Sequence, residues 1–461
     1  MKTLVINFEE AFSLKGLPFL KTNLPEVEIT GLLARNVAKE VYKEFPELPI
    51  FEKKITQEFL IQLNANYNID LALIEYLSPH EEQIFYHINR YFDTTLAFDY
   101  SLLKYKLILY VLDILQKSKP DILYFGVTPH DPVSYVLYLV AMYKELEIVI
   151  ITENSVFNSY ILYKEIGKQM SFIMGGAKED VDVKLLDKQR HVKVCLDALL
   201  SEEPSYMSQQ RKAAGSIVRK VTNSLFVKKR VTLSGWKRYK RANQMKKAYE
   251  ALSQVRNDSD LNNINEKIIF FPLHFQPELT TSPDGGFFSQ QWLAIKKLSE
   301  IFKEGYIILV KEHPSQFMIN SKPVRSHMFY DALLSIAPNI RLASLNLPSK
   351  VILKNVAGVS TITGTVGFEA LLHEKPVLFF GDARFSEISG TYDFNANQGM
   401  PDFEKAVSIG NLFNKENVIS DFEELVKSKF YYCYNPADAH EERTLEAMKS
   451  LLDEYLRWRK V

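Results

Sequence analysis

The chain has 461 residues with 56 basic and 56 acidic side chains, so its formal net charge is zero. A neutral molecule has no general preference for polyanions, and without a recognised binding module we expect no nucleic-acid partner. Only two cysteines occur, which excludes a disulfide framework and a cysteine-based metal cage. The length predicts two domains. The N-terminal apolar run is too short for a secretory signal and no run approaches membrane-spanning length, so we expect a cytoplasmic protein.

Strands and helices alternate along the first half of the chain. Apolar runs predict strands at residues 4–8, 121–126 and 147–152, and helical spacing predicts helices at residues 102–118 and 132–145. A strand, a crossover helix and a second strand form the βαβ unit of a parallel sheet. We therefore predict an N-terminal α/β domain over residues 1–203.

Residues 204–262 predict a basic helical connector. No Asp or Glu occurs between residues 204 and 249, and the basic side chains are interleaved with apolar ones that include Leu225, Phe226, Trp236 and Tyr239. The basic residues are Arg211, Lys212, Arg219, Lys220, Lys228, Lys229, Arg230, Lys237, Arg238, Lys240, Arg241, Lys246 and Lys247. Such a segment also fits peripheral contact with the anionic inner face of a cell membrane, at about 1 kcal/mol per cation. Both interpretations stay open.

The second half repeats the alternation. Strands are predicted at residues 267–271, 306–310, 356–361 and 376–380, with a helix at residues 290–302. This pattern predicts a C-terminal α/β domain over residues 263–435. Residues 436–461 form an amphipathic pattern that predicts a last helix, packed back on the first domain or paired with a partner. The whole chain thus predicts two doubly wound α/β domains, with ligands at the carboxyl ends of the strands.

The most informative stretch, residues 360–381, reads as a loop, a helix and a buried strand. A helix start offers unpaired backbone N–H groups and partial positive charge, which attract phosphate. Ser360, Thr361, Thr363 and Thr365 place hydroxyl groups at this point. The alternative is an ordinary strand–turn–helix in which these residues only cap the helix.

Glycines and one acid favour the ligand interpretation of this stretch. Gly364 and Gly367 would let the backbone approach a ligand closely. A capping box requires an acid three residues after the cap, but Glu369 lies four residues after Thr365. The two therefore share a helix face, and Glu369 is placed to accept hydrogen bonds from a ribose. Simple stabilisation of the helix dipole by Glu369 is the alternative.

Two more polar loops follow predicted strands of the second half. The first carries His274, Gln276 and Glu278, and the second carries Lys311 and His313. Lys311 and His313 are two residues apart in extended chain, so we expect both to face the same way and to donate to a phosphate. On its own, His313 also fits a strand-end histidine that is satisfied by backbone carbonyls.

These motifs together resemble a known family. The pairs Gln276-Pro277 and His313-Pro314, with Ser360-Thr361 and the run from Gly364 to Leu371, resemble the capsular polysaccharide synthesis glycosyltransferases, which include the Kdo transferases. The resemblance covers residues 267–381. It implies a GT-B architecture of two Rossmann-like domains facing a cleft. It also implies a nucleotide-sugar donor, often a CMP-linked ulosonic acid such as Kdo or a sialic-acid-like sugar, and an oligosaccharide or lipid-linked acceptor, with no metal or other cofactor.

The resemblance also implies roles for the polar loops. His274, Gln276 and Glu278 would orient the donor, and Glu369 would bind its ribose. Lys311 and His313, with the hydroxyl and N–H groups of Ser360, Thr361, Thr363, Gly364 and Thr365, would stabilise the departing phosphate. Such preorganised donors accelerate a reaction when they bind the transition state more tightly than the ground state.

The acceptor hydroxyl needs a general base, which would come from the N-terminal domain. His130, Asp131 and Glu153 lie just after two predicted strands and are the candidates. A carboxylate among them would instead be the nucleophile in a retaining enzyme. His130 also fits a plain turn residue beside Pro129, and Glu153 fits an acid that precedes a helix.

Three other functions remain open from the sequence. A nucleotide-sugar 2-epimerase would use the same phosphate-binding helix on a single substrate. A CDP-polyol phosphotransferase would share the same polar loops. A non-catalytic polysaccharide assembly protein would use the basic segment and would not depend on those loops.

Overall fold

The computed structural model divides the chain into two compact units, one holding the elements from β1 to β7 and one running from residue 189 to residue 425. The structure describes residues 2–6, 17, 21–22, 25–35, 37, 39–65, 67–92, 97–154, 159–166, 168–169, 196, 233–276, 278–317, 325–383, 385–410 and 412–429. The helix predicted at residues 436–461 and the basic segment before residue 233 lie outside these ranges.

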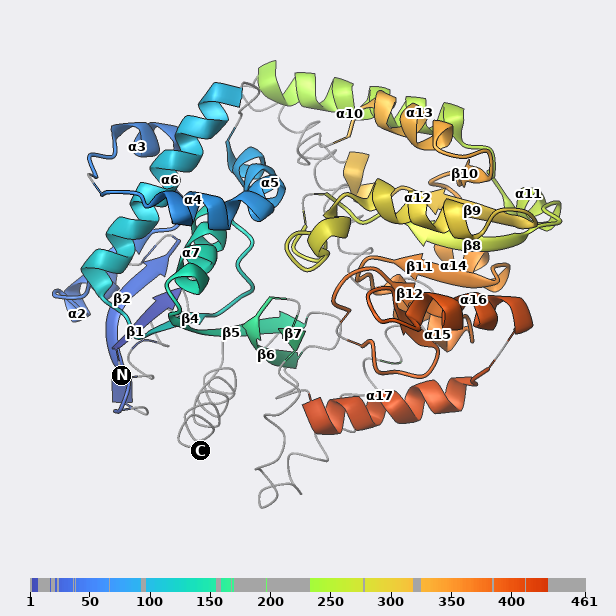
Figure 1. The fold of residues 1–461 in the computed structure, drawn as a ribbon. Coiled ribbons are helices and arrows are strands. Elements are labelled where there is room, and N and C mark those ends of the chain that lie inside the picture. The colour runs from blue at the N-terminus through green and yellow to red at the C-terminus, as the bar shows by residue number, and fades with distance from the viewer. Residues whose placement is uncertain are drawn as a thin grey trace, which may run out of the picture. The chain divides into compact units, whose positions relative to one another are not determined.

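The described part of the first unit contains a seven-stranded sheet in the order β3-β2-β1-β4-β5-β6-β7 (Figure 1). Its strands are β1 (Lys2–Ile6), β2 (Glu28–Ala34), β3 (Ile50–Glu52), β4 (Ile122–Phe125), β5 (Glu147–Asn154), β6 (Ser159–Glu165) and β7 (Lys168–Gln169). The first five pair in parallel, and the last two are antiparallel additions at one edge. All four residues of β4 are buried, which is typical of a strand covered on both faces.

Helices connect these strands and pack against one another. They are α2 (Lys39–Glu44), α3 (Gln57–Gln62), α4 (Leu71–Leu77), η1 (Ser78–His80), α5 (Glu81–Tyr91), α6 (Ala97–Ser118) and α7 (Pro132–Tyr143). Helix α7 is buried along its first ten residues and therefore lies in the core of the unit. It starts at Pro132, whose fixed φ suits the first helical position, and it is capped by the Asp131 carboxylate.

The second unit contains a six-stranded, fully parallel sheet in the order β10-β9-β8-β11-β12-β13. Its strands are β8 (Lys267–Pro272), β9 (Tyr306–Lys311), β10 (Ile340–Leu342), β11 (Gly358–Thr361), β12 (Val377–Phe379) and β13 (Thr391–Asp393). Its helices are α10 (Leu233–Leu252), α11 (Asp258–Asn262), η2 (Gly286–Ser289), α12 (Gln291–Ile301), η3 (Pro314–Phe317), α13 (His327–Ser335), α14 (Ser349–Lys354), α15 (Val366–Leu372), α16 (Gly399–Ile409) and α17 (Lys415–Lys429).

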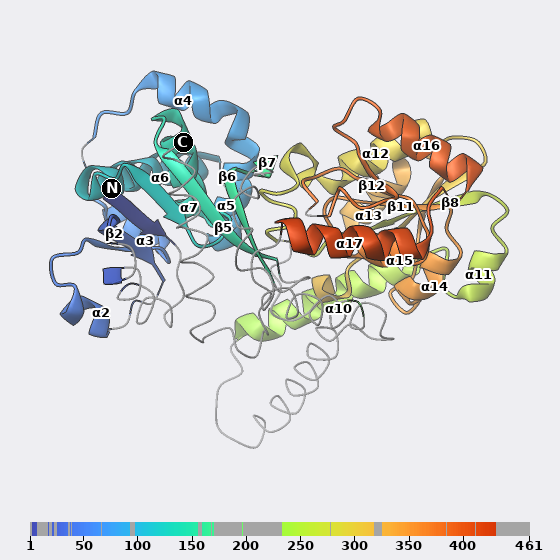
Figure 2. The same cartoon turned by 90° about the horizontal axis from the view of Figure 1, so that it is seen from below.

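Side chains from both faces of this sheet form the core of the second unit. Helix α10 joins that core through the fully buried Tyr249. On the other side, α17 lies along α15, where the ring centroids of Phe368 and Phe422 are 5.0 Å apart (Figure 2). Within the described ranges, no helix combines the length and the apolar composition that crossing a bilayer requires.

Both sheets reverse their strand order at one point, which fixes where a ligand would bind. In each unit the chain builds strands outward on one side of its first strand and then on the other, so the reversals fall between β1 and β4 and between β8 and β11. Ligands of doubly wound folds bind outside the carboxyl ends of the strands at such a point. The predicted class, α/β with two Rossmann-like doubly wound domains, is confirmed.

Candidate functional site

Two polar loops meet at the reversal point of the second sheet. The loop after β8 brings the Nε2 atom of His274 to 2.9 Å from the Oγ1 atom of Thr361, the last residue of β11. Thr361 Oγ1 also accepts the N–H of Gly364 at 3.2 Å. A Cβ atom on Gly364 would lie 2.8 Å from Thr361 Oγ1 and 3.1 Å from His274 Nε2. The two loops are therefore in close contact, and only glycine fits between them.

His274 joins these loops as a neutral ring. Burial lowers its pKa to about 3, and the positive charges of Arg325 and of His313 in its protonated form act in the same direction. Its Nδ1 atom lies 3.4 Å from the hydroxyl of Thr280. His274 thus connects strand ends by hydrogen bonds and does not offer a positive charge to a phosphate at neutral pH.

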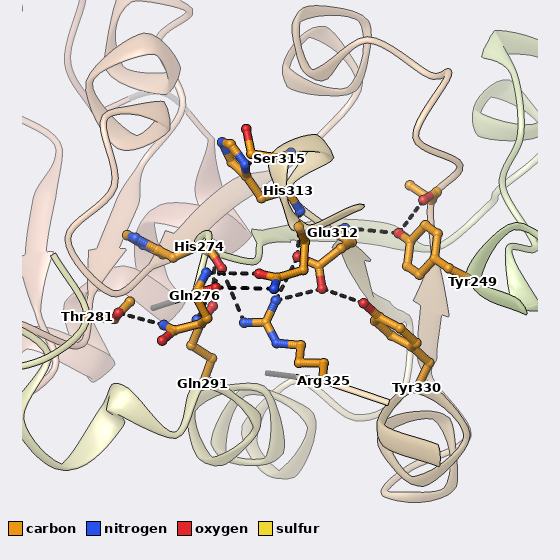
Figure 3. A network of polar contacts seen from close by, with 12 residues as sticks. Tyr249, His274, Gln276, Thr281, Gln291, Glu312, His313, Ser315, Arg325 and Tyr330 are labelled. Atoms are coloured by element: carbon orange, nitrogen blue, oxygen red, sulfur yellow. Dashed lines mark hydrogen bonds and ion pairs between the residues drawn. The ribbon is translucent and has the colours of Figure 1, made fainter. Parts of the chain in front are cut away.

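Two glutamines hold the backbone of the loop after β8 (Figure 3). Gln291 accepts the His274 N–H at 2.8 Å and donates to the His274 carbonyl at 3.4 Å. Gln316 does the same for Gln276, at 2.9 Å and 3.2 Å. Each side-chain amide therefore satisfies one donor and one acceptor of the same residue, as a neighbouring strand would. Sequence reasoning missed both glutamines.

The side chain of Gln276 has a fixed orientation. The hydroxyl of Thr281 donates to the Glu278 carbonyl at 2.9 Å, so its oxygen accepts the Gln276 amide N–H at 2.5 Å. Because the amide nitrogen of Gln276 points to Thr281, its Oε1 atom points away from Thr281. This oxygen is buried and has no partner among the described residues. An unsatisfied buried acceptor costs about 1–3 kcal/mol, so a ligand donor here would be stabilising.

A buried ion pair contacts the loops after β8 and β9. Nη1 of Arg325 donates to both carboxylate oxygens of Glu312 at 2.7 Å and 2.6 Å, and the hydroxyl of Tyr330 donates to Oε2 at 2.7 Å (Figure 3). Arg325 Nη2 also reaches the His274 carbonyl at 3.2 Å. Glu312 Oε1 accepts the N–H of His313 at 2.6 Å. The pair therefore positions the loops after β8 and β9 together, and sequence reasoning missed both of its members.

His313 has a defined proton position. Its Nδ1 accepts the N–H of Ser315 at 3.2 Å, so the neutral ring carries its proton on Nε2. Burial lowers the pKa of His313, and the Glu312 carboxylate partly offsets this. At neutral pH the ring is a donor through Nε2–H.

Lys311 is the last residue of β9, which ends one residue later than the sequence predicts. Its ammonium group donates to the carbonyl of Leu347 and approaches the hydroxyl of Ser349 at 3.5 Å. Burial lowers its pKa to about 8. Lys311 therefore holds the segment after β10. His313, in contrast, contacts Ser315 of its own loop.

The hydroxyl groups near β11 differ in their partners. Ser360 is fully buried in the strand and donates to the Leu378 carbonyl at 3.2 Å, so it supports the sheet. Thr363 donates to the Thr280 carbonyl at 2.6 Å and ties the same two loops together. Thr365 occupies the cap position of α15 without a side-chain capping bond, so its hydroxyl is not used by the helix.

Three further residues of the predicted site have different surroundings. Gly367 does not admit a ligand, because a Cβ atom there would meet the ring of Phe379 at 2.8 Å. Glu369 is half-buried, and burial raises the pKa of its carboxyl against the opposing charge of Lys350. The carbonyl of Glu278 accepts the N–H of Ser282 at 3.1 Å and closes the turn after β8.

In the first unit, His130 and Asp131 lie between β4 and α7. His130 Nδ1 lies 2.8 Å from the Thr128 carbonyl, which only accepts, so the neutral ring carries its proton on Nδ1 and leaves Nε2 basic. Burial lowers the pKa of His130, which Asp131 partly offsets. Burial alone would raise the pKa of Asp131, but Lys53, 2.9 Å away, lowers it below its usual value.

Glu153 lies inside β5, opposite Tyr160 of β6, and not just after the strand as the sequence predicts. The strand is longer than expected because β6 pairs with it as an antiparallel neighbour, and the side chain of Glu153 falls outside the described part. Within the described ranges, no group of three or more His, Cys, Asp or Glu residues could hold a metal ion.

Comparison with known proteins connects this site to a family. Residues 209–408 match the family described as "Capsule polysaccharide biosynthesis protein". No curated protein matches the sequence of the chain. This match confirms the resemblance that the motifs predict.

The solved structures that match the chain are distant in sequence. KpsC from Thermosulfurimonas dismutans, titled beta Kdo 2,7 transferase, is 12% identical, with a TM-score of 0.36, and the match covers 98% of this chain and 99% of that one. Its beta Kdo 2,4 transferase is 10% identical, with a TM-score of 0.29 and coverages of 65% and 78%. UDP-GlcNAc 2-epimerase from Neisseria meningitidis is 14% identical, with a TM-score of 0.21 and coverages of 99% and 100%. The family match thus makes residues 209–408, somewhat less than half of the chain, similar to the capsule polysaccharide biosynthesis proteins.

Proposed function

We propose that the chain is a glycosyltransferase that moves a sugar from a nucleotide donor onto a growing surface polysaccharide or a glycolipid. The observation that carries this proposal is the junction of His274 and Thr361 at the reversal point of a parallel sheet, where such folds bind nucleotides. The family match of residues 209–408 supports capsule synthesis as the process. The paired motifs at Gln276 and His313 favour a CMP-linked ulosonic acid such as Kdo as the donor.

The second unit would bind the nucleotide and stabilise its departure. Breaking the glycosidic bond leaves negative charge on the phosphate, and Nε2–H of His313 is a preorganised donor for it. The hydroxyl of Thr365, which the helix does not use, and the backbone at Gly364 would donate to the same group. The buried carbonyl oxygen of Gln276 would accept a hydrogen bond from the donor molecule. These groups require no divalent metal.

The first unit would supply the general base, and His130 is better suited to this role than Asp131. Nε2 of His130 is the basic atom of a neutral ring, whereas Asp131 is bound by Lys53 and caps α7. A positioned base contributes about 10²–10⁴-fold to the rate. Asp131 would then position its neighbour and not react itself.

Peripheral membrane contact through residues 211–247 is part of the same proposal. In its described portion, Lys240, Arg241, Lys246 and Lys247 are exposed on α10. Sedimentation with phosphatidylglycerol vesicles tests the contact. Binding that weakens when Lys246 and Lys247 are both changed to Gln supports it, and binding equal to that of neutral vesicles contradicts it.

Release of CMP from CMP-Kdo by the full chain, with a capsular oligosaccharide as acceptor and EDTA present, tests the transfer reaction. His313→Ala should lower kcat by about 10²–10³-fold, the usual loss for one oxyanion donor. His130→Asn should lower it by about 10²–10⁴-fold. His373→Ala, in the same unit at the far end of α15, is the matched control and should remain active. Normal turnover by a folded His313→Ala variant contradicts the proposal.

A further inference from the structure

Basic side chains gather at the carboxyl edge of the first sheet. Arg35 directly follows β2, Lys53 directly follows β3, and the turn with His130 follows β4. Arg90, from the last turn of α5, donates to the His130 carbonyl at 3.4 Å. Because β1 to β4 are parallel neighbours, these strand ends lie along one edge of the sheet. Arg35, Lys53, Arg90 and His130 therefore form one cluster at this edge of the sheet.

The ring of Tyr91 connects Arg35 to this group. The guanidinium carbon of Arg90 lies 5.8 Å from the centroid of the Tyr91 ring. Burial raises the pKa of Tyr91, Asp131 adds to this rise, and the positive charges of Arg90 and Arg35 oppose it. Both arginines and Asp131 are therefore within electrostatic reach of the same hydroxyl.

Cations exceed carboxylates in this cluster. Asp131 is already engaged, since Lys53 lies 2.9 Å from its Oδ2 and the Ser134 N–H donates to its Oδ1 at 3.0 Å. Arg35 is exposed and Arg90 is half-buried, and no carboxylate among the described residues forms an ion pair with either. After the pair of Lys53 and Asp131 is counted, the guanidinium groups of Arg35 and Arg90 have no ion-pair partner among the described residues.

Among the described residues, Glu52 is another acid at this edge, and it forms no ion pair with either arginine. Glu52 ends β3, and its Oε1 accepts the N–H of Lys54 at 2.9 Å. The start of α7, a helix of 12 residues, adds partial positive charge at the same edge. Planar guanidinium groups match carboxylate and phosphate oxygens in a bidentate manner. Two such groups beside a basic His130 are suited to hold an anion next to a reacting hydroxyl.

We propose that Arg35 and Arg90 form a binding site for an oxyanion, either a carboxylate or a phosphate, carried by the acceptor. The acceptor would then be an acidic sugar chain or a phosphate-bearing glycolipid, with its anion held near His130. The role of the bound molecule as an acceptor rests on the proposed transferase function. The anion site itself is a property of the first unit.

Ligand-observed saturation-transfer NMR with the full chain tests this site. The probes are glucuronate for a carboxylate, glucose 1-phosphate for a phosphate, and glucose as the uncharged control. At least one anion should bind where glucose does not. Arg90→Gln and Arg35→Gln should each weaken that binding about tenfold, since a hydrogen bond to a charged group has this magnitude. Lys54→Gln, which removes an exposed cation from the same loop as Lys53, is the matched control and should bind as the wild type.

The preferred anion separates the two acceptor classes, because glucuronate represents an acidic sugar and glucose 1-phosphate a phosphate group. Equal binding by the wild type and both arginine variants overturns the proposal, as does equal binding of glucose and the anions. If Arg90→Gln does not fold, Arg90→Lys replaces it and should retain more affinity than Arg35→Gln. A CMP titration of the same variants should be unchanged, so loss of the anion site and failure of the nucleotide site are distinguishable.

Discussion

His274 and Thr361 are 87 residues apart in sequence and lie within one hydrogen bond of each other, with 2.9 Å between Nε2 and Oγ1. Their contact connects the end of β8 to the end of β11 at the point where the strand order of the second sheet reverses. Gly364 closes against both side chains. The nucleotide site that we propose is built around this contact, so changes at it should separate ligand binding from folding.

Gly364→Ala should weaken nucleotide binding by at least tenfold. The added Cβ would lie 2.8 Å from Thr361 Oγ1, closer than real Cβ atoms approach, and would separate the two loops. Calorimetric titration with CMP measures the effect. Gly410→Ala is the control, since its φ of 95° makes alanine strained at a position far from the loops in sequence. It should lower the Tm and leave the affinity unchanged; equal affinities for all three proteins would contradict the prediction.

Glu312→Gln should lower the free energy of unfolding by about 3–5 kcal/mol, because it leaves the Arg325 charge buried and unbalanced. The double variant Glu312→Gln with Arg325→Met should lose less than the two single variants combined. Urea unfolding measures these differences. Glu300→Gln removes an exposed ion pair with Lys296 and should leave stability almost unchanged. Additive losses in the double variant would show that the two residues do not act as a pair.

Stability should fall as the pH is lowered from about 6.5, and His274 should be one cause. Its folded pKa of about 3 lies below the model-peptide value of 6.5, so the unfolded chain binds more protons between these values. The free energy of unfolding then falls with falling pH by up to about 1.4 kcal/mol per pH unit, and this group adds no pH dependence above 6.5. His274→Asn should reduce the slope measured by urea unfolding from pH 7 to pH 5. An unchanged slope would contradict the buried neutral ring.

Thr281→Val should cost about 1–3 kcal/mol of stability, because the Gln276 amide loses the acceptor that fixes its orientation. The substitution keeps the shape of the side chain, so packing is not a competing cause. Thr365→Val is the control for stability, since its hydroxyl makes no capping bond. A Thr281→Val variant as stable as the wild type would show that the Gln276 carbonyl is not fixed in place.

The sequence predicts the elements whose apolar runs are long and uninterrupted. The strand predicted at residues 267–271 is β8, and the helix predicted at residues 290–302 is α12 with ends shifted by one residue. Strands β10 and β13 have only three residues each, too few to show a period, and none was predicted there. Ser360 is expected to offer its hydroxyl near the helix start, but the hydroxyl donates to the Leu378 carbonyl of the neighbouring strand.

The sequence could not predict the contacts in the site between residues from distant parts of the chain. Gln291 lies in the helix predicted at residues 290–302 and Gln316 in the loop that follows the strand at residues 306–310, and their role depends on which strands are neighbours. Arg325 reaches Glu312 across a stretch with no sequence signal for pairing. The partner of Lys311, a backbone carbonyl at Leu347, is likewise invisible in a pattern of residue types. The motifs indicated the loops correctly, and the parallel register of the sheet determined their contacts.

Calorimetric titration of the full chain with CMP, CDP, UDP, GDP and ADP, in the presence of EDTA, tests the central claim most directly. If the loops joined by His274 and Thr361 bind a nucleotide, CMP should bind selectively. His313→Ala and Gly364→Ala should both weaken this binding. Binding of UDP alone would contradict the CMP-linked donor and favour a hexose transferase or an epimerase. No binding of any of the five nucleotides would contradict the claim itself.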